Sequence, residues 1–203
     1  MSLEIIEYKT SNSSESELLA TIKQRTGLEL EALDSGSSVR KTYSVRFPDM
    51  ETSQNVSIAD FSYNGTLFID TNNHFLCYTI SSGLGTYDYV DYLYKTMVCD
   101  FNGKLSNVCG HNNTDWEFAM NIHQGLNTSY YYIENDHSKS DITLCPLRAC
   151  GSDANNSSDS AVRGFVKNCY VNYERQFQRD LKFIDQNGNR FVTLGGYLLY
   201  KVD

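Results

Sequence analysis

A histidine and a carboxylate four residues apart form the pair in this sequence best suited to acid–base chemistry. His111 and Asp115 could serve as a general base and the group that orients it, with a serine or cysteine nearby as the nucleophile. His123, His137 and Asp136 follow in the same half of the chain. The sequence contains neither a nucleophile elbow nor a phosphate-binding glycine-rich loop. A hydrolase that uses His111 and Asp115 is therefore the third of our functional hypotheses.

Six cysteines raise the question of whether disulfide bonds brace the fold, because an even number is typical of secreted proteins. They stand at positions 77, 99, 109, 145, 150 and 169. Cys145 and Cys150 could close a small loop. Cys99 and Cys109 flank Asn102-Gly103, but a two-residue turn there would pair Cys99 with Ser106, which leaves these two cysteines apart. The alternative is six reduced thiols, with those in strands acting as small core residues.

The spacing of potential ligands predicts no metal site, and nothing in the sequence predicts a cofactor. The Cys-Gly-His segment at 109–111, taken with His123, matches no structural zinc pattern. Asp185 begins a segment that starts like a calcium loop. Arg190 stands where such a loop needs glycine, and Gly196 where it needs glutamate. That segment instead predicts a turn between two strands.

Two clusters of tyrosine, in a chain with 15 tyrosines, are the best candidates for a binding surface. The first comprises Tyr87, Tyr89, Tyr92 and Tyr94, and the second comprises Tyr130, Tyr131 and Tyr132. A strand with aromatic residues on both faces either buries both faces or exposes some of the rings. Exposed aromatic clusters mark contacts with protein, glycan or planar ligands. Core packing is the alternative role for these side chains.

One helix followed by many short strands would position these residues. Ser14 and Glu17 form a capping box, and Gly27 suits a helix C-cap, so the sequence predicts a helix between them. Residues 28–33 alternate in polarity and fit either a strand or a further helical turn. From residue 39 the polarity alternates with a period of two, which predicts strands.

Turn signals divide the remainder into about nine to eleven short strands at roughly 8–12-residue spacing. Asn64-Gly65 and Asn102-Gly103 each predict a β-hairpin. The predicted fold is mainly β, or α+β if the helix is counted: an antiparallel sandwich or barrel with one short N-terminal helix. We expect residues 1–38 to form a helical segment packed on or appended to an antiparallel β domain at 39–203.

The acidic composition narrows the choice of partner. The 203 residues carry a formal charge of −8 and have a pI near 5.0. Nucleic-acid binding requires clustered basic residues, and the nearest approach, Arg40-Lys41 with Arg46, lies in an alternating strand-like segment. No apolar stretch has the length of a membrane span. We therefore expect a protein or glycan partner, self-assembly included, and neither nucleic acid nor a membrane span.

The first residues of the sequence give an indication of the cellular compartment of the protein. Met-Ser-Leu-Glu-Ile-Ile-Glu has neither a basic leader nor an apolar region suited to a signal peptide. We expect a cytoplasmic protein or a component of a virion or another assembly, or else an extracellular protein from which a leader was removed. The cysteine count favours the extracellular alternative, so the two indications conflict.

The leading functional hypothesis is a non-enzymatic β-rich binding module, or a structural module of an assembly, that presents loops rich in Tyr, Asn and Ser to its partner. The second hypothesis is a calycin-like closed barrel that holds a small apolar or planar ligand. An enclosed cavity would distinguish the barrel from the binding module.

Overall fold

The structure is a computed structural model, and it describes the chain with gaps. The described residues are 3–33, 40–59, 61–80, 95–101, 103–110, 116–124, 127–134, 142–150, 162–172, 180, 182–185, 187–195 and 198–202. These residues fall into two compact units that divide between Asn107 and Val108. The division predicted from the sequence, after residue 38, stays a prediction. Each unit is described by itself.

Helix α1 spans Glu15–Thr26 and has the two ends that the sequence predicts. The Glu17 backbone N–H donates to Ser14 Oγ at 3.3 Å, and the Ser14 N–H donates to Glu17 Oε2 at 2.7 Å. This second bond, with those from the Ser14 and Ser13 hydroxyls, lowers the pKa of Glu17. Gly27 ends the helix with φ +76°, and its N–H donates to the Lys23 carbonyl at 2.9 Å. The capping-box prediction is confirmed.

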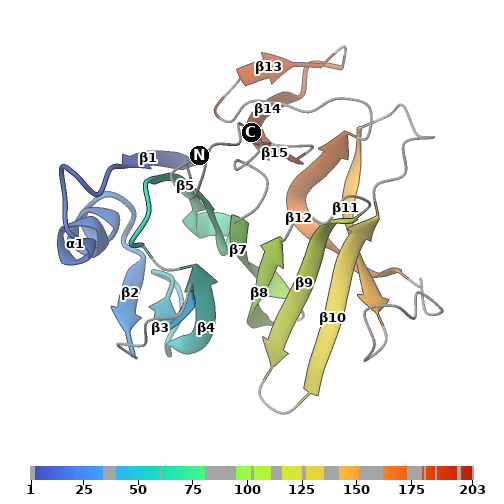
Figure 1. Ribbon diagram of the computed structural model, residues 1–203. Coiled ribbons are helices and arrows are strands. Elements are labelled where there is room, and N and C mark those ends of the chain that lie inside the picture. Colours follow the sequence, from blue (N-terminus) through green and yellow to red (C-terminus); the bar gives the residue numbers. More distant parts are fainter. Residues whose placement is uncertain are drawn as a thin grey trace. The chain divides into compact units, whose positions relative to one another are not determined.

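The first unit contains two antiparallel sheets and the helix (Figure 1). The larger sheet has the strand order β1-β5-β6-β7-β8, and the strands span Glu4–Tyr8, Gly65–Asp70, Phe75–Ile80, Lys95–Phe101 and Lys104–Gly110. The smaller sheet has the order β2-β3-β4, spanning Glu29–Ala32, Arg40–Arg46 and Gln54–Ala59. A 3₁₀ turn, η1, spans Thr71–Asn73 between β5 and β6. Residues 28–33, ambiguous in the sequence, thus supply strand β2.

One hydrophobic core joins the helix to both of these sheets. Leu18 and Ile22 of α1 are buried in it together with Leu30 of β2 and Tyr43 of β3. The larger sheet contributes buried side chains from β1, β5, β6, β7 and β8, which include Ile6, Leu67, Tyr78, Val98 and Leu105. Every residue of β5 and of β6 is buried, so both faces of these two strands are covered.

The hairpin predicted at Asn64-Gly65 is wrong, because β4 pairs with β3 whereas β5 pairs with β1 and β6. Gly65 is required there by a close approach. A Cβ atom on Gly65 would lie 2.7 Å from the Thr79 carbonyl oxygen and would clash with the Tyr78 ring. The hairpin predicted at Asn102-Gly103 is confirmed. Strand β7 ends at residue 101 and β8 begins at residue 104, and Gly103 has φ +78°.

The second unit contains one antiparallel sheet of order β13-β14-β15-β12-β11-β10-β9. In chain order its strands β9 to β15 span Trp116–Gln124, Asn127–Glu134, Ile142–Cys150, Val162–Asn172, Lys182–Ile184, Arg190–Gly195 and Leu198–Val202. The turn predicted at Asp185 joins β13 to β14. Asp185 Oδ1 accepts the Asn187 and Asn189 N–H groups at 2.8 Å each, and Gly188 has φ +83°.

The predicted fold class, mainly β with antiparallel sheets and one helix, is confirmed. The sheets formed by the described strands do not close into a barrel, so the barrel alternative for the fold is wrong. The calycin-like ligand-binding hypothesis stays a prediction. Within the described ranges, neither helical segment has the length and apolar character of a membrane span.

Candidate functional site

The residues predicted to do chemistry fall outside the described part of the chain. The catalytic candidates His111 and Asp115 lie there, as do Tyr87, Tyr89, Tyr92 and Tyr94. Tyr130, Tyr131 and Tyr132 lie in strand β10, where they pair with β9 on one side and β11 on the other. The side chains of that strand are not among those described, so the binding role of these tyrosines stays a prediction.

The cysteines also divide into those whose side chains the structure describes and those whose side chains it does not describe. Cys77, Cys99 and Cys169 are buried, and no disulfide joins any of the cysteines whose side chains are described. Cys145 and Cys150 both lie in strand β11. An extended segment of five residues spans roughly 16 Å, far more than the Cα separation of a disulfide, although the pairing of β11 with β12 shifts register twice between these residues. Their disulfide stays a prediction.

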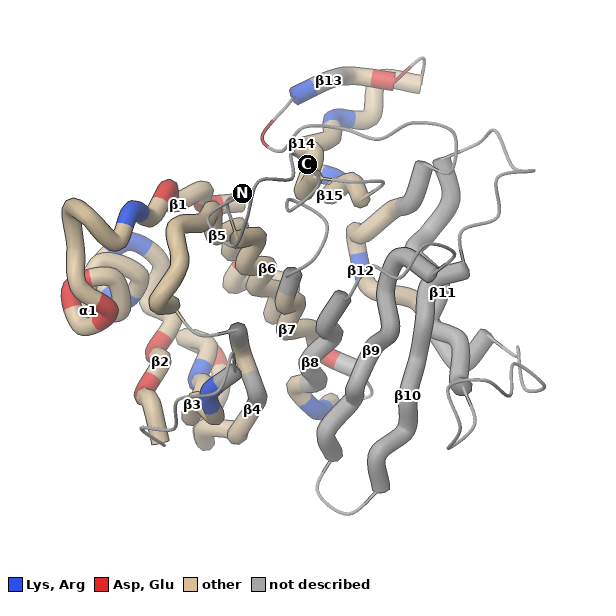
Figure 2. Tube along the Cα trace, in the orientation of Figure 1, with Lys and Arg blue, Asp and Glu red and all other residues tan. Residues whose placement is uncertain are grey.

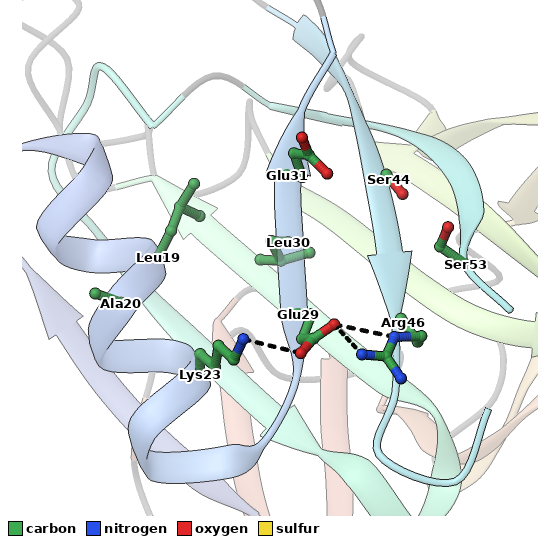
Figure 3. Close-up of a pocket in the computed structure, with 9 residues that line it drawn as sticks. All are labelled: Leu19, Ala20, Lys23, Glu29, Leu30, Glu31, Ser44, Arg46 and Ser53. Carbon is green, nitrogen blue, oxygen red and sulfur yellow. Dashed lines mark hydrogen bonds and ion pairs between the residues drawn. The ribbon is translucent and has the colours of Figure 1, made fainter. Parts of the chain in front are cut away.

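A surface groove lies beside α1. Its volume is about 350 Å³. The lining comes from α1, from β2, and from β3 with the residues after it: Leu19, Ala20, Lys23, Glu29, Leu30, Glu31, Ser44, Arg46 and Ser53 (Figure 3). We call it the α1–β2 groove. Glu29 pairs with Arg46, and Glu31 pairs with Ser44, so these four side chains share one face of the small sheet.

The charges within the α1–β2 groove are arranged around Glu29. The Lys23 ammonium lies 2.9 Å from Glu29 Oε1, and Arg46 Nε donates to Glu29 Oε2 at 2.9 Å from the opposite side (Figure 3). Hydrogen bonds from Lys23 and then Arg46 lower the pKa of Glu29, so this carboxylate stays ionised at neutral pH. Glu31 makes no ion pair within the described chain. Figure 2 shows both acidic positions of β2 in red.

A second groove lies on the other side of α1, against strand β1. Its volume is about 300 Å³, and it is lined by Ile6, Glu7, Tyr8, Lys9, Asn12, Ser13, Leu18 and Thr21. Beside it, Arg25 reaches from α1 to the edge of β1. One guanidinium nitrogen lies 2.7 Å from Glu4 Oε2 and 3.2 Å from the Ile5 carbonyl oxygen. Arg25 therefore covers a backbone acceptor that β1 turns away from its sheet partner.

A histidine with two carboxylates ties the two sheets of the first unit together. His74 Nε2 lies 2.7 Å from Asp49 Oδ1, and His74 Nδ1 lies 3.3 Å from Asp100 Oδ2. The His74 ring also packs on Phe47, with the ring centroids 5.1 Å apart. Burial lowers the pKa of His74, but the hydrogen bonds to Asp49 and Asp100 outweigh it and raise the pKa overall. The hydrogen bond from His74 lowers the pKa of Asp49.

Sequence reasoning missed the residues of the α1–β2 groove and the His74 cluster. The groove has no motif, and its only sequence signal is the alternation of Glu29, Leu30 and Glu31, which places two acidic residues on one strand face. His74 and its two carboxylates are about 25 residues apart in the chain, and only folding brings them together. The chain matches no protein-family model, and neither the curated proteins nor the solved structures include a significant match.

Proposed function

We propose that this chain is a non-enzymatic binding module that engages a partner protein at the α1–β2 groove. The observation that carries the proposal is that apolar and charged side chains line the same groove. Leu19 and Leu30 supply apolar area, and the pair formed by Glu29 and Arg46 supplies fixed charges. Protein-recognition sites combine apolar contacts with a small number of placed polar groups in this way.

The chemistry of the groove favours a protein over a glycan. Sugar rings stack on aromatic side chains, and none of the described residues that line the groove is aromatic. The groove also lacks the electrostatics of an acid–base catalyst. A catalytic carboxyl group works best with a pKa near the operating pH, whereas the pKa of Glu29 is moved below its ordinary value.

An unbiased peptide-display selection tests this function. Peptides enriched on the wild-type protein are measured again on Ser44→Trp, which places a bulky ring in the groove at a strand position that tolerates aromatic residues. Thr42→Trp is the matched control, because Thr42 lies two residues along the same strand and outside the groove lining. We expect Ser44→Trp to abolish binding and Thr42→Trp to preserve it. A selection that yields no peptide with this pattern would overturn the proposed function.

A further inference from the structure

The hydrogen-bonding direction of each residue in β2 follows from its pairing with β3. Glu29 pairs with Arg46 and Glu31 with Ser44, and the Leu33 N–H donates to the Thr42 carbonyl at 2.9 Å. In an antiparallel pair, alternate residues direct both backbone groups to the partner strand. Residues 29, 31 and 33 therefore face β3. Leu30 and Ala32 direct their N–H and C=O groups to the opposite side.

That opposite side is the edge of the small sheet beside α1 (Figure 3). Strand β2 ends the order of its sheet, and no hydrogen bond within the described chain reaches the outward backbone groups of Leu30 or Ala32. Leu30 lines the α1–β2 groove, and Ala32 is exposed. An edge of this kind is a template on which an extended peptide adds a strand. The other edge strand of this sheet is engaged, since Gln54 Oε1 of β4 accepts the Leu105 N–H at 2.7 Å.

The side chains along the edge define what an added strand would carry. Residues opposite Leu30 would lie on the core-facing side of the sheet, next to Leu19, which Figure 3 shows on the side of α1 toward β2. Residues opposite Glu31 would lie on the outer side, beside a carboxylate that makes no ion pair within the described chain. The first position favours an apolar side chain and the second a basic one.

The charges also select against a second copy of this chain. Two β2 strands paired antiparallel about Glu31 would place like charges opposite one another, which destabilises a sheet. The whole chain carries a formal charge of −8, so a cationic partner is attracted and a second copy is repelled.

We propose that β2 accepts an extended segment of a partner protein as an added strand, and that apolar and basic side chains alternate along this segment. The inference rests on the proposed function and specifies how the α1–β2 groove is used. Backbone pairing with Leu30 and Ala32 supplies affinity, and Leu19 and Glu31 supply selectivity.

A synthetic peptide of alternating isoleucine and lysine is the probe. Its isoleucines would lie opposite Leu30 and Ala32, so their N–H groups would point at β2, while the lysine N–H groups would point away. N-methylation of the isoleucines is expected to weaken binding by at least about tenfold, and N-methylation of the lysines to change it little. In NMR hydrogen exchange, the bound peptide is expected to protect the Leu30 and Ala32 amides and to leave the already paired Glu31 amide unchanged.

Two variants of the protein complete the test. Ala32→Pro removes an N–H that does not serve the pairing with β3, so the sheet is kept and the added strand is lost. Glu31→Lys is expected to weaken the isoleucine–lysine peptide about two- to fivefold and to strengthen an isoleucine–glutamate peptide by a similar factor.

The outcomes separate this inference from the proposed function. In one outcome, Ser44→Trp abolishes binding, whereas neither Ala32→Pro nor N-methylation of the isoleucines affects it. This result overturns the added strand and leaves the binding groove intact. Absence of binding by the isoleucine–lysine peptide overturns the proposed occupant, whatever the display selection yields. In a third outcome, the peptide-free protein dimerises as its concentration rises, and Ala32→Pro abolishes this dimerisation. The occupant of the edge would then be a second copy of the chain, which would also overturn the inference.

Discussion

The two strands that flank α1, β1 and β2, are both edge strands, and side chains of α1 make different contacts with the two edges. On the β1 side, Arg25 binds the Glu4 carboxylate and also the outward Ile5 carbonyl. On the β2 side, Lys23 binds the Glu29 side chain, and its bond does not extend to the strand backbone. Each edge thus has one ion pair with α1, but only β1 has a backbone acceptor covered by it.

This difference shows how one helix can protect one sheet edge and leave another available. Proteins commonly blunt exposed edges with charged side chains, because an uncovered row of N–H and C=O groups invites pairing. The guanidinium of arginine carries five donors in a fork and can serve a carboxylate and a carbonyl together, whereas an ammonium is a point charge. The choice of Arg25 and Lys23, both in the last turn of α1, therefore separates a closed edge from an open one.

The largest effect is expected from Gly65→Ala, which disturbs β1 and spares β2. Gly65 pairs with Tyr8 at the end of β1, and an added methyl group would meet the Tyr78 ring and the Thr79 carbonyl. We expect the free energy of unfolding in urea to fall by about 3 kcal/mol, the range of overpacked cores.

Gly103→Ala is the control for this substitution. Gly103 has φ +78° and no atom within 4 Å of an added Cβ, so only backbone strain is introduced, about 1 kcal/mol. Equal losses in the two variants would show that the close approach of Tyr78 and Thr79 to Gly65 adds nothing to the backbone strain. Hydrogen exchange should show β1 amides opening in Gly65→Ala while the β2 amides keep their wild-type rates.

A smaller effect is expected from Arg25→Met, which removes the guanidinium and keeps an apolar stem. The Ile5 carbonyl then loses its donor, and β1 acquires an open edge like that of β2. We expect a loss of about 1 kcal/mol in the free energy of unfolding together with increased self-association in light scattering. Lys23→Met, which removes only the ion pair with Glu29, should lower the free energy of unfolding less than Arg25→Met does and leave association unchanged. Identical association in both variants would contradict the assignment of Arg25 as the cover of β1.

Sequence signals that act within a few residues predicted the structure well. The ends of α1 depend on Ser14, Glu17 and Gly27, which contact only their own helix, and both ends are confirmed. The turn at residues 102–103 is equally local. Asn64-Gly65 carried the same local signal and failed, because its glycine serves the approach of Tyr78 from 13 residues further along the chain.

The candidate site could not be predicted, because an open edge is a property of topology. The alternating pattern of residues 28–33 is compatible with a strand. Which strand pairs with β2, and on which side of β2 it lies, depends on Arg40–Arg46 and on α1. The pair of Arg25 with the Ile5 carbonyl likewise joins residues 20 positions apart through a backbone atom, which has no residue-type signature.

The smallest effect concerns a polar contact between the two sheets that contain β1 and β2. Strands β1 and β2 belong to different sheets, and His74, which precedes β6, joins them by binding Asp49, which follows β3. A neutral imidazole has one N–H and can donate to only one of Asp49 and Asp100, whereas the protonated ring donates to both. Protonated His74 therefore favours the joined sheets.

The pH dependence follows from the directions of the two pKa shifts. Because the pKa of His74 is raised in the folded protein, its stabilisation is fully present below the unfolded value of about 6.5 and is lost as pH rises through the folded-state pKa. Because the pKa of Asp49 is lowered, its stabilisation is present above about pH 4 and is lost as pH falls through the folded-state pKa. We expect this contact to be strongest between about pH 4 and 6.5 and to weaken by at most about 1 kcal/mol toward pH 8.

His74→Asn is the variant that isolates this contribution, since His74 has φ +48° and asparagine tolerates the left-handed conformation. Urea unfolding at pH 6 and pH 8 should show wild-type stability falling more steeply with pH than that of the variant. Parallel profiles would mean that other groups set the pH dependence. If instead the profiles diverge, and the Leu30 and Ala32 amides exchange faster at pH 8 in the wild type beyond the intrinsic change with pH, then protonation of His74 also governs how the β2 edge is presented beside α1.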